Sequence, residues 1–228
     1  MKRIIGIVSI LLLIYLQGAS QEFKYDPSLT LYKYEGYTFN FQNFAGEFNP
    51  EIKQKLVEAY FKVYPALVKE FNPSAKREIT LTIDSLLSTV GNNSGSTIRF
   101  HPKWLEGRPE DIDVLTHHLM NVLQGYNNYQ APFWLETGIS DYVRFKYGVN
   151  NEAANWSFSA PLPFEKYFYG YRTTARFLAW VDSNVKRGFV RALYQQLNKT
   201  LYADTIWVQL TGKPIDELWS NYVASPSI

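Results

Sequence analysis

Two adjacent histidines stand near the start of the most chemically capable stretch of the chain, Leu115 to Arg144. In the zinc-peptidase pattern H-E-x-x-H, two histidines four residues apart share one helix face and bind zinc, and the glutamate between them activates the metal-bound water. His117 and Asn121 have this spacing, and His118 stands where the glutamate would be. Asparagine is a poor zinc ligand, and imidazole does not replace the carboxylate base. The residues alone therefore favour a packed or hydrogen-bonded histidine over a metal ligand.

Other reactive side chains give weaker patterns. Glu136 and Asp141 could form a carboxylate pair, but five residues apart on a helix they do not face one site, which favours capping or salt bridging. Ser140 and Ser157 have no histidine at a recognisable spacing, so nothing indicates serine catalysis. His101 lies on a predicted strand and is expected to be exposed.

An aromatic segment, Tyr167 to Tyr171, could form one wall of a ligand groove together with Trp134 and Trp156. Such a groove could bind a peptide or a sugar, because aromatic rings offer large flat contact surfaces. Aromatic residues at this density also commonly build a core. The segment is thus a second candidate site, independent of the histidines.

The first twenty residues, Met1 to Ser20, have the pattern of a secretory signal peptide. Two cations, Lys2 and Arg3, precede an apolar run that is shorter than the roughly 20 residues needed to cross a bilayer. Cleavage near Ser20 would leave a single domain, residues 21–228, without a stable membrane anchor. The expected location is secreted or periplasmic.

Charge and cysteine content restrict the function classes. The chain has 23 basic and 21 acidic residues, so removal of Lys2 and Arg3 leaves 21 of each. A neutral mature chain argues against nucleic-acid binding, which usually needs a basic surface. The chain has no cysteine, so the exported fold must be stabilised by its core and not by disulfides.

Hydrophobic periodicity predicts a small set of strands followed by a mainly helical half. The expected strands are a hairpin or two short strands over Leu29–Phe44, then Arg77–Ser85 and Thr97–His101, with a flexible turn at Gly91–Ser96. The expected helices are Pro50–Phe71, Pro109–Gly125, Pro132–Gly148, Gly170–Val185, Gly188–Asn198 and Pro214–Val223, with an irregular segment over Asn150–Phe168. This order indicates the α+β class.

Two segments carry a specific family resemblance: Gly138 to Arg144 (GISDYVR) and Thr174 to Leu178 (TARFL). Through them and their surroundings, most of the mature chain resembles the basic secretory protein family, plant and bacterial proteins regarded as zinc peptidases of the gluzincin type. The resemblance implies an α+β, zincin-like fold with a small amino-terminal mixed sheet and a predominantly helical carboxy-terminal lobe. It also implies a cleft between Thr97–His101 and the helix that carries His117.

The resemblance assigns zinc-site positions in this sequence. The family's first zinc histidine matches His117, whereas its catalytic glutamate falls on His118 and its second histidine on Asn121. Its third ligand, a glutamate, falls on Thr137, and Glu136 is one residue early, about 100° around the helix. One ligand of three is therefore present and the base is absent, so no bound zinc is expected here, although active relatives use it.

Two supporting positions of the family are retained. The aspartate that orients a zinc-bound histidine falls on Asp141. Tyr171 lies where a tyrosine could stabilise an oxyanion. These matches indicate a shared fold more strongly than a shared activity.

Three hypotheses follow. The first is an exported, inactive relative of the peptidases that binds a peptide or another extended ligand along Thr97–His101, expected to be an edge strand. The second is an active metallopeptidase with an altered ligand set, such as His117, Glu136 and Asp141. The third is a glycan-binding or surface-interaction module built on the aromatic segment.

Overall fold

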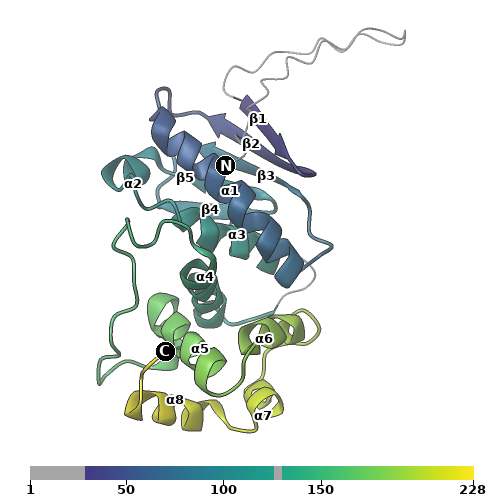
Figure 1. The fold of residues 1–228 in the computed structure, drawn as a ribbon, viewed down its shortest axis with the longest axis vertical. Coiled ribbons are helices and arrows are strands. Elements are labelled where there is room, and N and C mark those ends of the chain that lie inside the picture. The colour runs from purple at the N-terminus through teal and green to yellow at the C-terminus, as the bar shows by residue number, and fades with distance from the viewer. Residues whose placement is uncertain (1–28, 126–129) are drawn as a thin grey trace.

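The computed structural model describes residues 29–125 and 130–228, so the predicted signal peptide lies outside the described residues. A five-stranded sheet with one long helix across it forms the amino-terminal part, and shorter helices form the rest (Figure 1). The α+β class predicted from the sequence is confirmed. In the two described ranges, no helix combines the length and apolar character needed to cross a membrane.

The sheet is mixed and has the strand order β1-β2-β3-β5-β4. β1 (Leu29–Tyr34) and β2 (Tyr37–Asn43) form the expected hairpin, and both residues of its turn have positive φ angles. β2, β3 (Glu78–Ile83) and β5 (Thr97–Phe100) run parallel. A parallel pair needs a crossover connection, which the long helix α1 supplies between β2 and β3.

The fourth strand corrects the sequence prediction beside the cleft. β4 (Gly91–Ser94) pairs antiparallel with β5, although its Gly-Asn-Asn-Ser sequence predicts a turn. The turn is limited to Gly95 and Ser96, because four residues of pairing with β5 outweigh the weak local strand propensity. β5 is therefore an interior strand, and the sheet edge on this side is β4 and not Thr97–His101.

The long helix α1 (Pro50–Glu70) packs its apolar side on the sheet (Figure 1). Asn49 caps it, since the Glu51 backbone N–H donates to the Asn49 side-chain oxygen at 2.8 Å. Aromatic rings make the contact with the sheet: Phe39 of β2 stacks on Tyr60 of α1 with ring centroids 4.5 Å apart. The sheet and α1 thus form one layered unit.

Seven shorter helices follow in the described part of the chain. They are α2 (Pro102–Gly107), α3 (Val114–Gln124), α4 (Phe133–Tyr147), α5 (Tyr171–Asn184), α6 (Phe189–Leu197), α7 (Thr205–Thr211) and α8 (Ile215–Ala224). A single 3₁₀ turn, η1 (Tyr167–Tyr169), precedes α5. The segment between α4 and η1 has no regular structure, as the sequence predicts.

Three helices differ from the sequence prediction. The sequence predicts neither α2 nor α7, and α3 begins at Val114 instead of Pro109. The acidic residues before α3 suggested an earlier start, but they serve tertiary contacts. Trp104 Nε1 donates to Asp111 Oδ2 at 2.9 Å, and the Val149 backbone N–H donates to Asp113 Oδ1 at 2.9 Å. These contacts hold the preceding turns in a non-helical form.

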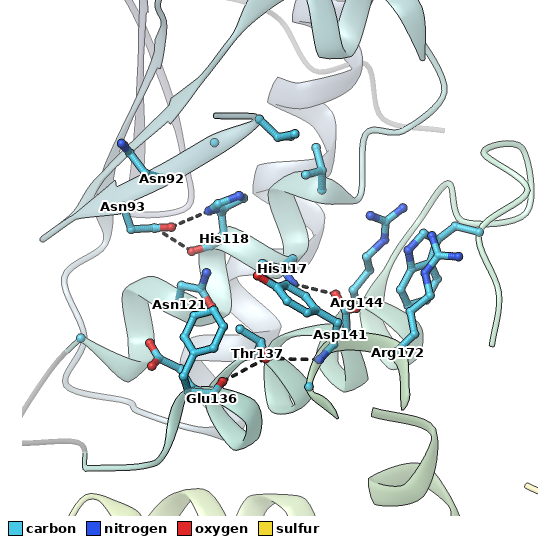
Figure 2. A pocket seen from close by; sticks show the side chains of 18 of the residues that line it. Asn92, Asn93, His117, His118, Asn121, Glu136, Thr137, Asp141, Arg144 and Arg172 are labelled. Carbon is cyan, nitrogen blue, oxygen red and sulfur yellow. Dashed lines mark hydrogen bonds and ion pairs between the residues drawn. The ribbon is translucent and has the colours of Figure 1, made fainter. Parts of the chain in front are cut away.

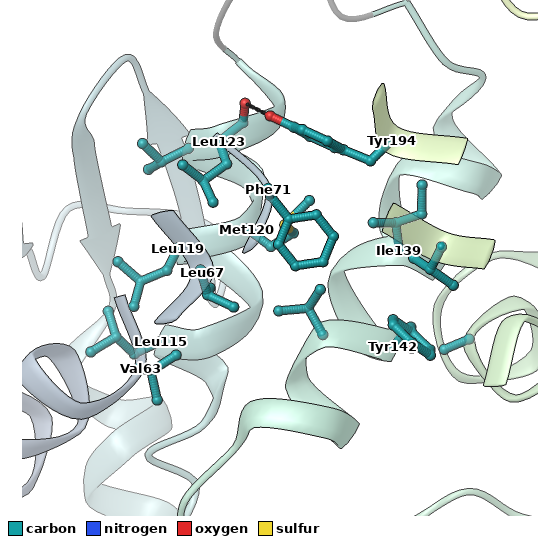
Figure 3. Packing of buried hydrophobic residues seen from close by; sticks show 14 of the residues in the cluster. Val63, Leu67, Phe71, Leu115, Leu119, Met120, Leu123, Ile139, Tyr142 and Tyr194 are labelled. Atoms are coloured by element: carbon teal, nitrogen blue, oxygen red, sulfur yellow. Dashed lines mark hydrogen bonds between the residues drawn. The ribbon is translucent and has the colours of Figure 1, made fainter. Parts of the chain in front are cut away.

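Helix α3 lies at the centre of the molecule, between α1, α4 and α6 (Figure 3). Its apolar residues Leu119, Met120 and Leu123 are fully buried. The Tyr194 hydroxyl of α6 donates to the Leu123 carbonyl oxygen at 2.8 Å, which ties the end of α3 to the helical part. Because these faces of α3 are buried, the face that carries the two histidines is held in a fixed position.

Helices α4 and α5 approach each other closely at a glycine. A Cβ atom added at Gly138 would lie 2.3 Å from Thr174 Cγ2, which is too close for any side chain. Glycine therefore permits this approach, and the approach brings the first turn of α5 to the cleft. Both residues belong to the two segments that carry the family resemblance.

Candidate functional site

A cavity of about 1040 Å³ opens between β4, α3, α4 and the start of α5 (Figure 2). Six side chains that the sequence singles out line it together: His117, His118, Asn121, Thr137, Asp141 and Tyr171. They come from α3, α4 and α5, and the fold brings them to one place. The structure thus supports treating these positions as one site.

His117 of α3 faces Asp141 of α4. The His117 Nδ1 and Asp141 Oδ1 atoms lie 2.7 Å apart, and the two side chains are 12% and 8% exposed. The structure therefore places the carboxylate at the histidine, as the family resemblance implies. Because Nδ1 is bonded, the second ring nitrogen, Nε2, is the atom left for another partner.

His118 is held by β4. Its Nδ1 atom lies 2.5 Å from Asn93 Oδ1, and Asn93 Nδ2 donates to the His118 carbonyl oxygen at 3.0 Å. A Cβ atom at Gly91 would lie 2.9 Å from His118 Nε2, so the imidazole depends on a glycine in β4. Burial, together with the neighbouring His117, lowers the pKa of His118 well below its usual value. His118 is a neutral side chain that joins α3 to the sheet.

Asn121 is bonded to α4. The Ser140 hydroxyl lies 2.5 Å from Asn121 Oδ1, 2.9 Å from Gln124 Oε1 and 3.1 Å from the Glu136 carbonyl oxygen. Ser140 is fully buried, so its hydroxyl has no access to water and depends on these acceptor oxygens for its hydrogen bond. Asn121 therefore contributes to the α3–α4 interface as well as to the cavity wall.

Thr137 is bonded to the start of α5. The Tyr171 backbone N–H donates to Thr137 Oγ1 at 3.2 Å, and that hydroxyl donates to the Phe133 carbonyl oxygen at 3.0 Å. Gly170, with φ +76°, allows the close approach, because a Cβ atom there would lie 2.9 Å from Thr137 Oγ1. Thr137 thus anchors the first turn of α5.

Tyr171 has a left-handed backbone conformation, with φ +46°. For a bulky residue this conformation costs about 1–3 kcal/mol, and it persists because the surrounding contacts impose it. The Tyr171 ring lies parallel to the His117 ring, with centroids 6.2 Å apart and an interplanar angle of 14°. The half-exposed tyrosine therefore covers His117 on the side of the cavity.

Glu136 lies at the cavity wall, one position before Thr137, on which the family's third ligand falls. Partial burial raises the pKa of its carboxyl, and the nearby His117 opposes this rise. In Figure 2, Glu136 and Asn121 stand on one side of the cavity, whereas Arg144 and Arg172 stand on the other. The two ends of the cavity therefore differ in charge.

The sequence analysis missed the cationic end. Two guanidinium groups lie over the Trp156 ring, that of Arg144 at 4.3 Å and that of Arg172 at 4.9 Å from the ring centroid. Arg144 is buried and its Nη2 lies 2.5 Å from Asp111 Oδ1, whereas Arg172 is exposed. Arg144 stands within the GISDYVR segment, but no spacing rule links it to Trp156, because the contact forms between separate parts of the chain.

The remaining candidates are divided between the cavity and other parts of the molecule. His101 is half-buried, and its Nδ1 accepts a hydrogen bond from the Lys103 backbone N–H, so it caps α2 instead of being simply exposed. Trp134 packs against Tyr167 and Tyr202 outside the cavity. Of the aromatic segment, Tyr169 and Tyr171 line the cavity.

Comparisons with known proteins identify the family of this chain. A family described as "Peptidase of plants and bacteria", BSP, matches residues 36–222. The chain belongs to the BSP family. No curated protein matches its sequence.

The BSP chain is also similar to solved structures. An M1 zinc metallopeptidase from Deinococcus radiodurans matches with a TM-score of 0.53 and 12% identity, over 84% of this chain and 49% of that one. A mutant M1 zinc metallopeptidase from Deinococcus radiodurans, bound to a Tyr-Ser-Ala substrate, matches with a TM-score of 0.51 and 14% identity, over 87% and 51%. The BSP chain thus spans about half the length of these structures, and the likeness concerns the fold.

The zinc ion that such a fold implies does not fit the donors of this cavity. A catalytic zinc takes three protein ligands and keeps one open position. His117 offers one nitrogen, whereas the Asn121 amide and the Thr137 hydroxyl are weak ligands bonded within the protein. Across residues 29–125 and 130–228, no group of three His, Cys, Asp or Glu side chains could hold a metal ion. The altered set of His117, Glu136 and Asp141 therefore gains no support.

Proposed function

We propose that this BSP-family protein binds an extended peptide in the cavity without hydrolysing it. The observation that carries the proposal is the bonding of the side chains around His117. His118 is bonded to β4, Asn121 to α4 and Thr137 to the backbone of α5. Peptide hydrolysis needs groups at these places that face a metal ion or a water molecule. Here they connect secondary-structure elements.

The edge of β4 supports the choice of ligand. Gly91, Asn92 and Asn93 line the cavity, and among the residues that the structure describes β4 pairs with β5 alone. An open strand edge offers backbone N–H and C=O groups, to which an extended peptide can add as a further strand. This contact depends on the backbone and not on zinc. The Tyr-Ser-Ala substrate of one structural relative is a ligand of the same class.

The first experiment measures metal content and cleavage. Elemental analysis of the protein purified at neutral pH is expected to give substoichiometric zinc, and a library of short peptides is expected to remain uncleaved. Tight stoichiometric zinc, or chelator-sensitive cleavage that His117→Ala abolishes, would contradict the proposal.

The second experiment measures binding. Short peptides selected on the immobilised protein are resynthesised with N-methyl groups at alternate backbone positions. Because N-methylation removes the N–H donor and adds bulk on the same edge, one of the two alternating patterns is expected to abolish binding and the other to retain it. Equal binding by both N-methylated forms would exclude strand addition to β4.

A further inference from the structure

A second, smaller cavity of about 310 Å³ adjoins the cleft at its arginine end. Trp104, Trp156 and Arg172 line both cavities, so the two form one continuous surface. Arg108 lines the smaller cavity as well. A ligand that lies in the cleft can therefore place one group in this second cavity.

The carboxylates of the smaller cavity already have partners. Glu110 Oε1 lies 2.6 Å from Lys55 Nζ. Asp111 accepts from Arg144 Nη2 at 2.5 Å and from Trp104 Nε1 at 2.9 Å. Each carboxylate of this cavity thus has a cationic partner within the protein.

Unlike these carboxylates, the two exposed arginines of the smaller cavity contact aromatic rings and, within the described part of the chain, no charged partner. Arg108 lies over the Trp104 ring at 4.0 Å, and Arg172 lies over the Trp156 ring at 4.9 Å. Neither guanidinium makes an ion pair or a side-chain hydrogen bond with any residue in the described ranges. The indole rings hold the guanidinium planes, so the N–H donors at their edges remain available to a ligand.

We propose that the smaller cavity is a carboxylate subsite, in which Arg108 and Arg172 bind an acidic side chain or the free carboxyl terminus of a peptide in the cleft. This inference rests on the proposed function, because the cleft holds the rest of the peptide. A planar guanidinium matches a carboxylate through two parallel hydrogen bonds. Glu136 at the opposite end of the cleft repels the same group, so the charge difference orients the ligand.

An acidic sugar carries the same charged group, but the aromatic residues favour a peptide. A sugar ring binds to an aromatic side chain through an open ring face. Trp156 is buried, with 8% of its surface exposed, and the guanidinium groups of Arg144 and Arg172 both lie over its ring. The subsite therefore offers charge and hydrogen-bond donors more than a stacking surface.

The test is a titration of the ¹⁵N-labelled protein, followed by NMR at the indole N–H groups of Trp104 and Trp156. The Trp104→Phe and Trp156→Phe variants assign the two resonances. The probes are N-acetylalanine with a free α-carboxylate, the α-amide of N-acetylaspartate with a side-chain carboxylate, and neutral N-acetylalanine amide. At least one carboxylate probe is expected to shift both resonances saturably, and the tighter one identifies the source of the carboxylate. Equal shifts with the neutral amide would overturn the proposal.

Variants locate the binding. The double variant Arg108→Gln/Arg172→Gln is expected to raise the dissociation constant about tenfold or more, whereas Arg187→Gln, an exposed arginine outside both cavities, is expected to leave it unchanged. The single variants give the same comparison if the double variant does not fold. Unchanged affinity in the arginine variants, or tighter binding of glucuronic acid than of both peptide probes, would overturn the peptide-carboxylate subsite.

The two proposals can fail separately. Saturable carboxylate binding without any binding of extended peptides would leave the subsite and remove the proposed function. Binding of extended peptides that is the same with acidic and with amidated neutral sequences, and is unaffected by Arg172→Gln, would remove the subsite alone.

Discussion

The centre of the cleft and its arginine end use polar side chains in opposite ways. At the centre, His118 is bonded to Asn93 and Asn121 to Ser140, so each polar group has a partner inside the protein. At the end, Arg172 has an aromatic neighbour but no acceptor within the described ranges. Buried polar groups need hydrogen-bond partners inside the protein and therefore contribute to the fold. Exposed cations are hydrated in the free protein and remain available to a ligand. The contrast separates what maintains this cleft from what can recognise a partner.

The largest effect is expected from converting the centre of the cleft into a metal site, which should change the zinc content of the protein. In the double variant Asn121→His/Thr137→Glu, two new ligands join His117, so about one zinc per chain is expected, against substoichiometric zinc in the unchanged protein. Elemental analysis after dialysis measures this. Adding His117→Ala to the double variant should remove the metal again. A double variant that binds no zinc would show that the helices do not present these three positions to one point.

The next largest effect is expected from removing the Ser140 hydroxyl at the centre of the cleft, which should lower the stability of the fold. Ser140→Ala is expected to lower the free energy of unfolding by about 1–3 kcal/mol, because the buried network around Asn121 loses its shared partner. Urea denaturation measures the change. Ser183→Ala, on an exposed part of α5, is the matched control and should change little. Equal effects in the two variants would mean that the central network does not stabilise the fold.

The buried imidazole of His118 should make stability depend on pH. Its pKa is lowered in the folded state, so between that value and about 6.5 the unfolded state binds more protons. The free energy of unfolding therefore rises with pH through this window, by up to about 1.4 kcal/mol per pH unit, and His118→Gln removes this part of the slope. Urea denaturation of both proteins at about pH 5 and about pH 7.5 tests it. The same slope in both proteins would exclude His118 as the cause.

The arginine end should give the smallest effect on stability. Arg172→Gln is expected to change the free energy of unfolding by less than about 0.5 kcal/mol, because the side chain is exposed and has no ion pair with a described residue. Urea denaturation measures the change beside Arg187→Gln. A loss comparable to that of Ser140→Ala would show that Arg172 supports the fold, and the contrast between the two ends would disappear.

Much of the fold could be predicted because its elements carry regular apolar patterns. The hairpin over Leu29–Phe44 and the helix over Pro50–Phe71 both follow the expected periodicity. β4 and the start of α3 could not be predicted in this way. In β4, pairing with β5 outweighs turn-forming residues, and before α3, side chains suited to a helix start are used in contacts with distant residues. Local preference and tertiary contact disagree at both places.

The site shows a similar division. The family resemblance placed His117 and Asp141 in one site, and the structure holds them 2.7 Å apart. It gave no indication of the Asn93–His118 contact, which joins residues 25 positions apart in different elements. The pairing of Arg108 with Trp104 was equally hidden, since any exposed arginine near a tryptophan gives the same sequence pattern.

The contact between Asn93 and His118 also restricts which substitutions position 118 can accept. Asn93 Nδ2 donates to the His118 carbonyl oxygen, so Asn93 Oδ1 is turned toward the side chain at position 118. A carboxylate introduced there would meet that oxygen, and turning the amide over would sacrifice the backbone hydrogen bond. A glutamate at position 118 is therefore expected to be tolerated without penalty only if β4 changes as well. The two positions are therefore expected to be epistatic, so that His118→Glu alone gives a less stable protein than His118→Glu combined with a change at Asn93.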